Sequence, residues 1–107
     1  MKPVYTITGA TGLLGSNLAN ELVKDGATVF ALIKDEQSKS ILSKDVNKVF
    51  GDITNKADIE YLIQKSQCQY FIHLAAQTQA YDSLKYPYQT FTNNIIGTLN
   101  VLECLRE

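Results

Sequence analysis

The sequence of 107 residues is long enough for one globular domain, spanning 1–107, and its 45% hydrophobic and 20% charged residues fit that class. Its ten basic and eleven acidic residues give a net charge of -1 without a long block of either sign, which argues against a nucleic-acid-binding or membrane-surface protein. Because there is no apolar run of bilayer-spanning length, no signal-peptide pattern and no metal-ligand or redox spacing around the two cysteines, we expect a cytoplasmic protein.

A glycine-rich stretch follows the first predicted strand, at 4–8. Gly9, Gly12 and Gly15 are separated by two residues each, and a helical pattern continues to about residue 24. Strand, glycine turn and helix are the context that a dinucleotide-binding fingerprint requires. We expect Gly9 to allow the turn, Gly12 to let a pyrophosphate approach the backbone, and Gly15 to let helix and strand pack closely. A glycine-rich turn that binds nothing is the alternative.

The rest of the chain alternates between strand and helix patterns. Strands are expected at 28–33, 46–50 and 70–74, and helices at about 13–24, 56–65 and 87–105. Gly26 is suited to ending the first helix, and Asn55 followed by Asp58 resembles a helix start. Two apolar stripes predict buried helix faces: Leu14, Leu18 and Leu22 in the first helix, and Phe91, Ile95, Thr98, Leu102 and Leu105 in the last.

This alternation predicts an α/β fold with a parallel sheet and right-handed crossovers. The expected architecture is Rossmann-type, with strand order 3-2-1-4 and helices on both faces. A ligand would bind at the carboxyl ends of the strands, where the strand order reverses between the first and the fourth.

Two charged residues follow the second predicted strand. An NAD site has a carboxylate for the adenosine ribose about twenty residues past the glycines. Lys34 and Asp35 lie in this region. Asp35 is placed for the ribose hydroxyls and Lys34 for the 2′-phosphate of NADP, so the choice of cofactor stays open. Both are solvated loop charges in the alternative interpretation.

Other candidates lie after the third and fourth strands. Asp52 is placed to accept a hydrogen bond from the adenine amino group, with the next backbone N–H on a ring nitrogen; a capping role before Thr54 is the alternative. Ala75 and Ala76 are small where a cofactor would approach the backbone. Asn94 lies inside the last predicted helix and is placed to bond the end of the fourth strand, unless it is simply exposed.

No catalytic residue and no metal ligand is predicted. His73, the one histidine, is expected to be a packed core residue. Tyr-x-x-x-Lys, a spacing that lets lysine lower the pKa of a tyrosine, occurs at Tyr61/Lys65 and at Tyr81/Lys85. Only Tyr81 follows the fourth strand, and a loop aromatic beside a solvated lysine is the favoured interpretation.

Four segments carry a family resemblance. They are Thr-Gly-Ala-Thr-Gly-Leu-Leu-Gly at 8–15, Gly-Asp-Ile at 51–53, His-Leu-Ala-Ala-Gln at 73–77, and Asn-Ile-Ile-Gly-Thr-Leu-Asn-Val-Leu-Glu at 94–103. Together they resemble the N-terminal part of the extended short-chain dehydrogenase/reductase family, and within it the nucleotide-sugar epimerases and 4,6-dehydratases. The resemblance covers essentially the whole chain.

The resemblance implies a tightly held NAD or NADP, which takes a hydride from the sugar C4 hydroxyl and later returns it. It also implies four groups of cofactor-binding residues. These are the pyrophosphate loop with Gly9, Thr11, Gly12, Leu13, Leu14 and Gly15; the NAD or NADP selector with Lys34 and Asp35; the adenine contacts Asp52 and Ile53; and the ribose and nicotinamide lining of Leu74, Ala75 and Ala76, supported by Asn94.

The sequence departs from this family in one respect. The family's catalytic Ser/Thr and Tyr-x-x-x-Lys follow a fifth strand, and this sequence stops at Glu107, before such a strand. We therefore expect a cofactor-binding portion that is inactive alone and that meets a nucleotide sugar only in the full-length protein. A non-enzymatic NAD(P)-binding or interaction module is the alternative. Self-association through the last helix or the edge of the fourth strand is also expected.

Overall fold

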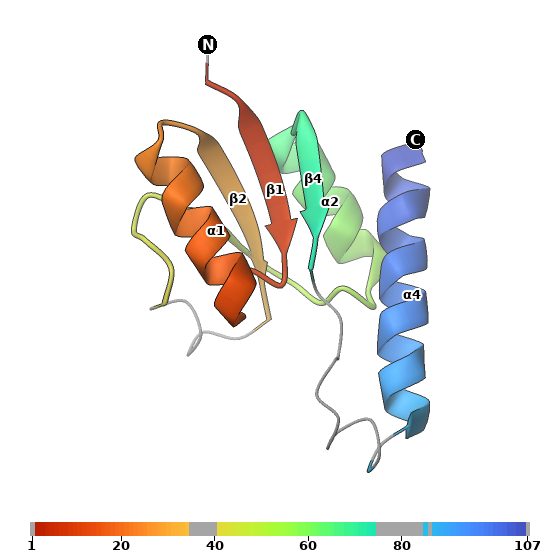
Figure 1. Cartoon of the computed structure of the whole chain (residues 1–107). Coiled ribbons are helices and arrows are strands. Elements are labelled where there is room, and N and C mark those ends of the chain that lie inside the picture. Colours follow the sequence, from red (N-terminus) through yellow and green to blue (C-terminus); the bar gives the residue numbers. More distant parts are fainter. Residues whose placement is uncertain (1, 35–40, 75–84, 86, 107) are drawn as a thin grey trace.

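The computed structural model describes residues 2–34, 41–74, 85 and 87–106 (Figure 1). It contains β1 (Val4–Thr8), α1 (Leu13–Lys24), β2 (Thr28–Ile33), β3 (Asn47–Phe50), α2 (Lys56–Ser66), β4 (Tyr70–His73) and α4 (Pro87–Arg106). The described strands form one parallel sheet in the order β3-β2-β1-β4. The predicted α/β class and strand order are confirmed, and the predicted boundaries of the helices and strands hold to within one residue.

Two apolar layers cover the sheet, because alternate side chains of a strand point to opposite faces. Val29, Ala31 and Ile33 of β2 pack in the layer that includes Ala19 of α1. The intervening residue Leu32 packs in the other layer, whose members from α2 and α4 are Ile59, Leu62, Val101 and Cys104. The sheet is thus covered by α1 on one face and by α2 and α4 on the other, as Figure 1 shows.

The predicted helix boundaries have clear physical causes. Gly26 has a φ of 95°, a left-handed conformation that glycine adopts without strain, so α1 ends there as expected. The side chain of Asn55 accepts a hydrogen bond from the N–H of Ala57 and caps α2. The N–H of Asn55, however, donates to the carbonyl of Asp52 at 2.9 Å and not to the side chain of Asp58. The carboxylate of Asp58 accepts from the N–H of Asp52 at 2.9 Å, and it therefore holds the preceding loop.

Both predicted apolar stripes need correction. In α1, Leu18 and Leu22 pack on the core, but Leu14 is 68% exposed. The buried positions in this helix belong to the small residues Gly15, Ser16 and Ala19, which allow the helix to lie close to the sheet. The first turn of α1 therefore leaves a large apolar side chain in solvent.

Most of the predicted apolar stripe of α4 does not pack on the sheet. Ile95, Leu102 and Leu105 are exposed, whereas the buried side chains of this helix are Val101 and Cys104. Ile96 and Leu99 add to the exposed apolar surface. α4 therefore docks through small and medium residues and presents its larger ones outward.

The described residues contain no group of three histidine, cysteine or acidic side chains that could hold a metal ion. Cys68 and Cys104 are free thiols. No helix within the described parts of the chain is both long and apolar enough to span a membrane.

Candidate functional site

The carboxyl ends of the strands meet at one end of the sheet (Figure 1). β1 continues into residues 9–12, β2 into Lys34, and β3 into residues 51–55. β1 and β4 are neighbours, with Thr8 opposite His73, and the strand order reverses between them. Ligands of open parallel sheets bind at such a reversal, so the candidate site lies here.

The glycine loop makes the closest approach between β1 and α1. Gly9 has a φ of 72° and its carbonyl accepts from the N–H of Gly12 at 3.2 Å, which closes the turn. A Cβ on Gly15 would lie 2.1 Å from the Gly9 oxygen, so no side chain fits there. The predicted structural roles of Gly9 and Gly15 are therefore present in the fold.

Gly12 differs from the other two glycines. A Cβ at this residue would lie 3.5 Å from the Gly9 oxygen, an ordinary contact, and the backbone is extended with a φ of -74°. The residue is also exposed. The packing of the loop therefore leaves room for a side chain at Gly12.

The start of α1 is open to an anion. Gly12 provides no side-chain cap, and the first turn contains no acidic residue. The first N–H groups of a helix have no acceptor within the helix and carry partial positive charge. Leu13 and Leu14 stand beside them with side chains that are 84% and 68% exposed. An anionic group placed here would meet free donors without a competing carboxylate.

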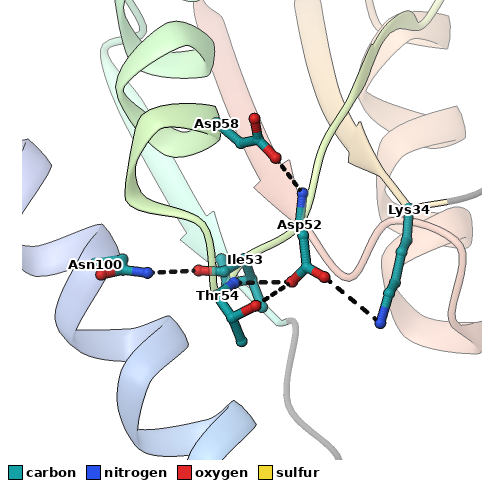
Figure 2. Close-up of polar contacts among 6 residues, drawn as sticks. All are labelled: Lys34, Asp52, Ile53, Thr54, Asp58 and Asn100. Atoms are coloured by element: carbon teal, nitrogen blue, oxygen red, sulfur yellow. Dashed lines mark hydrogen bonds and ion pairs between the residues drawn. The ribbon is translucent and has the colours of Figure 1, made fainter.

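A second loop at the same edge of the sheet is built around Asp52 (Figure 2). Its Oδ1 accepts from the backbone N–H of Thr54 at 2.9 Å and from the Thr54 hydroxyl at 2.7 Å. Its Oδ2 lies 3.7 Å from the Nζ of Lys34 at the end of β2, in a pair too exposed to stabilise the fold by much. The hydrogen bonds from Thr54, and then Lys34, lower the pKa of Asp52 from its ordinary value of 3.8, although burial opposes them.

Asp52 therefore holds the turn before α2, whereas Asn55 caps the helix, and Asp52 is ionised at neutral pH. Only one of its two oxygens is used by the turn. Among the residues that the structure describes, the N–H of Ile53 has no hydrogen-bond acceptor. An acceptor and a donor thus remain side by side on Asp52 and Ile53, and the predicted adenine contact stays a prediction.

Helix α4 contacts this loop at Ile53. The side-chain amide of Asn100 donates to the carbonyl of Ile53 at 3.0 Å (Figure 2). A Cβ on Gly97 would lie 2.9 Å from Cγ1 of Ile53, so α4 and the loop touch at this residue. Neither contact was predicted. The Gly-Thr-Leu-Asn run at 97–100 places both residues one helical turn apart and is the signal that could have indicated them.

His73 links three elements of the site. Its Nδ1 lies 2.6 Å from the hydroxyl of Thr8, and its Nε2 lies 3.2 Å from the hydroxyl of Thr98 in α4. The Thr8 hydroxyl also accepts from the N–H of Leu74. Partial burial lowers the pKa of His73, which favours the neutral ring. The expected packed histidine is thus a half-buried polar link, and the pairing of Thr8 with His73 follows from the parallel register.

Comparison with known proteins identifies the family. The model of the NAD dependent epimerase/dehydratase family matches residues 5–107. The chain belongs to this family. CDP-paratose 2-epimerase of Salmonella typhi is 34% identical over 94% of the chain, which covers 32% of that relative. A GDP-mannose 4,6-dehydratase of Sordaria araneosa is 33% identical over 94% of the chain, covering 19% of its length.

A solved epimerase has the same fold. The structure of Thermus thermophilus UDP-glucose 4-epimerase in complex with NAD superposes with a TM-score of 0.85 at 26% identity, over 96% of this chain and 33% of that one. The chain therefore spans about a third or less of the length of these epimerase/dehydratase relatives. The predicted resemblance to the N-terminal part of the family is confirmed.

The remaining predicted site residues of this epimerase/dehydratase chain are only partly described. Asp35, Ala75, Ala76 and Tyr81 lie outside the described residues. Thr11 is half-buried beside the glycine loop, and Leu74 and Asn94 are half-buried after β4 and in α4.

Tyr61 does not approach the site. It is exposed on α2, and the Nζ of Lys65 lies 5.7 Å from its ring centre. This is a surface cation–π contact rather than an acid–base pair at the edge of the sheet.

Proposed function

We propose that the chain is the NAD-binding portion of a nucleotide-sugar epimerase or 4,6-dehydratase and that it has no turnover alone. The observation that carries the proposal is the difference between two glycines. Gly15 is required by packing, since its Cβ would lie 2.1 Å from a carbonyl oxygen, whereas Gly12 has room for a side chain. A pyrophosphate that approaches the bare backbone at Gly12 supplies the missing reason for glycine there.

The residues present fit a dinucleotide. The open, neutral start of α1 suits the diphosphate, because unpaired N–H donors favour an anion. The Ile53 N–H, which has no acceptor among the described residues, and the Oδ2 of Asp52 suit the donor and acceptor edge of adenine. Bound NAD would supply a nicotinamide that takes a hydride at the sugar C4 and returns it. The Thermus relative was solved with NAD, which supports NAD over NADP.

The role proposed for the described residues is to bind and orient the cofactor, and none of them is placed at the site as an acid or base. Tyr61 and Lys65 form a surface pair on α2. His73 donates and accepts within the Thr8 and Thr98 link, and its lowered pKa disfavours a proton-carrying role at neutral pH. Catalysis would therefore depend on residues outside this sequence, as the family resemblance implies.

The test is calorimetric titration of the chain with NAD, NADH, NADP and NADPH, followed by incubation with UDP-glucose, CDP- and GDP-sugars. We expect binding of NAD or NADH, weaker binding of the phosphorylated forms, and no conversion of any sugar. Conversion would overturn the proposed inactivity. Failure of all four dinucleotides to bind would overturn the cofactor role and favour a module that acts only through protein contacts.

A second function, in protein association, is favoured by α4. Ile95, Ile96, Leu99, Leu102 and Leu105 leave a contiguous apolar side of this helix in solvent, which is typical of an interface. β4 is an edge strand of the described sheet, with Tyr70 exposed. We propose that a second copy of the chain covers one of these surfaces.

Multi-angle light scattering tests this self-association. We expect a dimer or a larger species, and conversion to monomer by Leu99→Lys together with Leu102→Lys. Glu60→Lys on α2, also an exposed position, is the control and should leave the mass unchanged. A monomer at high concentration would contradict the proposal.

The two thiols support a cellular location. Neither Cys68 nor Cys104 forms a disulfide bond. Thiols remain reduced in the cytoplasm, and we propose that compartment for the chain. A thiol assay on protein isolated from the cell should count both cysteines as reactive after unfolding.

A further inference from the structure

We propose that Asn100 is a positioning residue for the adenine side of the dinucleotide site. It does not touch the cofactor; it fixes the peptide group that orients Asp52. This inference rests on the proposed function, because it assigns a role in the same site to a residue of α4 that neither the sequence patterns nor the family resemblance indicated.

The first step concerns one planar peptide group. The carbonyl of Ile53 and the N–H of Thr54 are the two polar ends of the same peptide unit, which rotates as a rigid plane. Asn100 donates to the carbonyl end at 3.0 Å. The N–H end donates to Oδ1 of Asp52 at 2.9 Å. The amide of Asn100 therefore sets the direction from which Asp52 is held.

The second step concerns the Asp52 carboxylate. Because Oδ1 receives both the backbone N–H and the hydroxyl of Thr54, the side chain is fixed with Oδ2 away from the turn, 3.7 Å from the Nζ of Lys34. This leaves Oδ2, beside Lys34, as the carboxylate oxygen that the turn does not use. Rotation of the Ile53–Thr54 peptide would withdraw the N–H that holds Oδ1 and would thereby change the direction of Oδ2.

The third step explains why α4 reaches the loop. Gly97 has no side chain where a Cβ would lie 2.9 Å from Ile53, so the helix approaches closely enough for Asn100 to bond the carbonyl. Asp58 of α2 also accepts from the N–H of Asp52. The loop is thus fixed between two helices (Figure 2), a stronger restraint than a surface turn requires.

The experiment compares Asn100→Ala with Asn47→Ala. Asn47 makes the same kind of bond, from its side-chain amide to the carbonyl of Val29 at 3.2 Å, at the start of β3 and away from the carboxyl ends of the strands. Calorimetric affinities are measured for NAD, for AMP as the adenine-side probe, and for inorganic pyrophosphate as the glycine-loop probe.

We expect Asn100→Ala to weaken the binding of NAD and of AMP by the same factor, roughly tenfold, for the loss of one partly buried hydrogen bond. Pyrophosphate affinity should change less than about twofold, and Asn47→Ala should change none of the three. Asn100→Asp, which cannot donate to the carbonyl, should weaken AMP at least as much as the alanine variant. The circular dichroism spectrum of Asn100→Asp should match that of the unchanged chain.

Three outcomes overturn the inference. They are an unchanged AMP affinity in Asn100→Ala, an equal loss of AMP and pyrophosphate affinity, and an equal effect of Asn47→Ala. In each of these the unchanged chain still binds NAD, so the proposed function stands. If the unchanged chain binds neither NAD nor AMP, the proposed function fails and the inference fails with it.

Discussion

A Cβ on Gly15 would lie 2.1 Å from the carbonyl oxygen of Gly9. The helix and the strand therefore meet at a distance that no other residue at this position permits. The same substitution would also crowd the Cα of Ala10, at 2.9 Å. Since these neighbours are backbone atoms, they cannot rotate away as a flexible side chain would.

Gly15→Ala should consequently destabilise the chain by about 2–4 kcal/mol, through displacement of α1 from the sheet. Urea unfolding followed by circular dichroism measures the change. Ala57→Gly changes an exposed position in the first turn of α2 and is the control for the intrinsic difference between alanine and glycine in a helix. Its free energy of unfolding should fall by no more than about 1 kcal/mol. A Gly15→Ala variant as stable as the unchanged chain would contradict the close approach.

Gly12→Ala should act on the ligand and not on the fold. The loop has room for its methyl group, but that group would occupy the surface that the proposed pyrophosphate would approach. We expect NAD affinity to fall by roughly tenfold or more, with a free energy of unfolding within about 0.5 kcal/mol of the unchanged chain.

Gly26→Ala is the complementary control. Gly26 has a φ of 95° and lies at the end of α1 away from the site, so alanine there should reduce stability by roughly 1 kcal/mol and leave NAD affinity unchanged. If Gly12→Ala binds NAD normally, the ligand explanation of this glycine is wrong.

Thr6 offers a stabilising substitution. Its hydroxyl is fully buried in β1 and has no hydrogen-bond partner among the described residues. Thr6→Val removes this unsatisfied group with little change of shape, and it should raise the free energy of unfolding by about 1 kcal/mol. Thr8→Val is the matched control, because the Thr8 hydroxyl bonds His73 and Leu74, and this variant should lose stability. Destabilisation by Thr6→Val would indicate a partner for its hydroxyl.

His73 should make stability depend on pH. Burial lowers its pKa in the folded chain below the ordinary value of 6.5, so the unfolded chain takes up a proton first as the pH falls. The stabilisation by the neutral ring is therefore complete above about pH 6.5 and decreases as the pH falls below it toward the folded pKa.

Urea unfolding at pH 7.5 and at pH 5.5 measures this effect. We expect the free energy of unfolding of the unchanged chain to be lower at pH 5.5 than at pH 7.5. In His73→Gln the decrease should be smaller, because glutamine does not titrate. An equal pH dependence in both proteins would assign the effect to other groups.

The sheet and the glycine loop could be predicted because their signals are local. Apolar runs gave the strands, and the spacing of Gly9, Gly12 and Gly15 gave the loop. The contact side of α4 could not be predicted from apolar periodicity, since periodicity favours large residues. The helix instead docks through Gly97, Val101 and Cys104, where small volume matters more than hydrophobicity.

The polar contacts of the site could not be predicted from the sequence for a different reason. Asn100 bonds a carbonyl 47 residues away, and His73 bonds Thr8 at a separation of 65 residues. Such pairs depend on the strand register and on where a helix crosses the sheet, and neither is encoded in a short window of sequence. Asp52 was found because its position directly after a strand is a local feature.

The Thr8 hydroxyl has a mechanical consequence. It is shared between the ring of His73 and the N–H of Leu74, while His73 also reaches Thr98. The end of β1 at Thr8 and the start of the chain after β4 at Leu74 are therefore linked through one hydroxyl group. His73 connects that group to Thr98 of α4. A shift of α4, such as one produced by a partner on its outer surface, would therefore change the positions of Thr8 and Leu74 together.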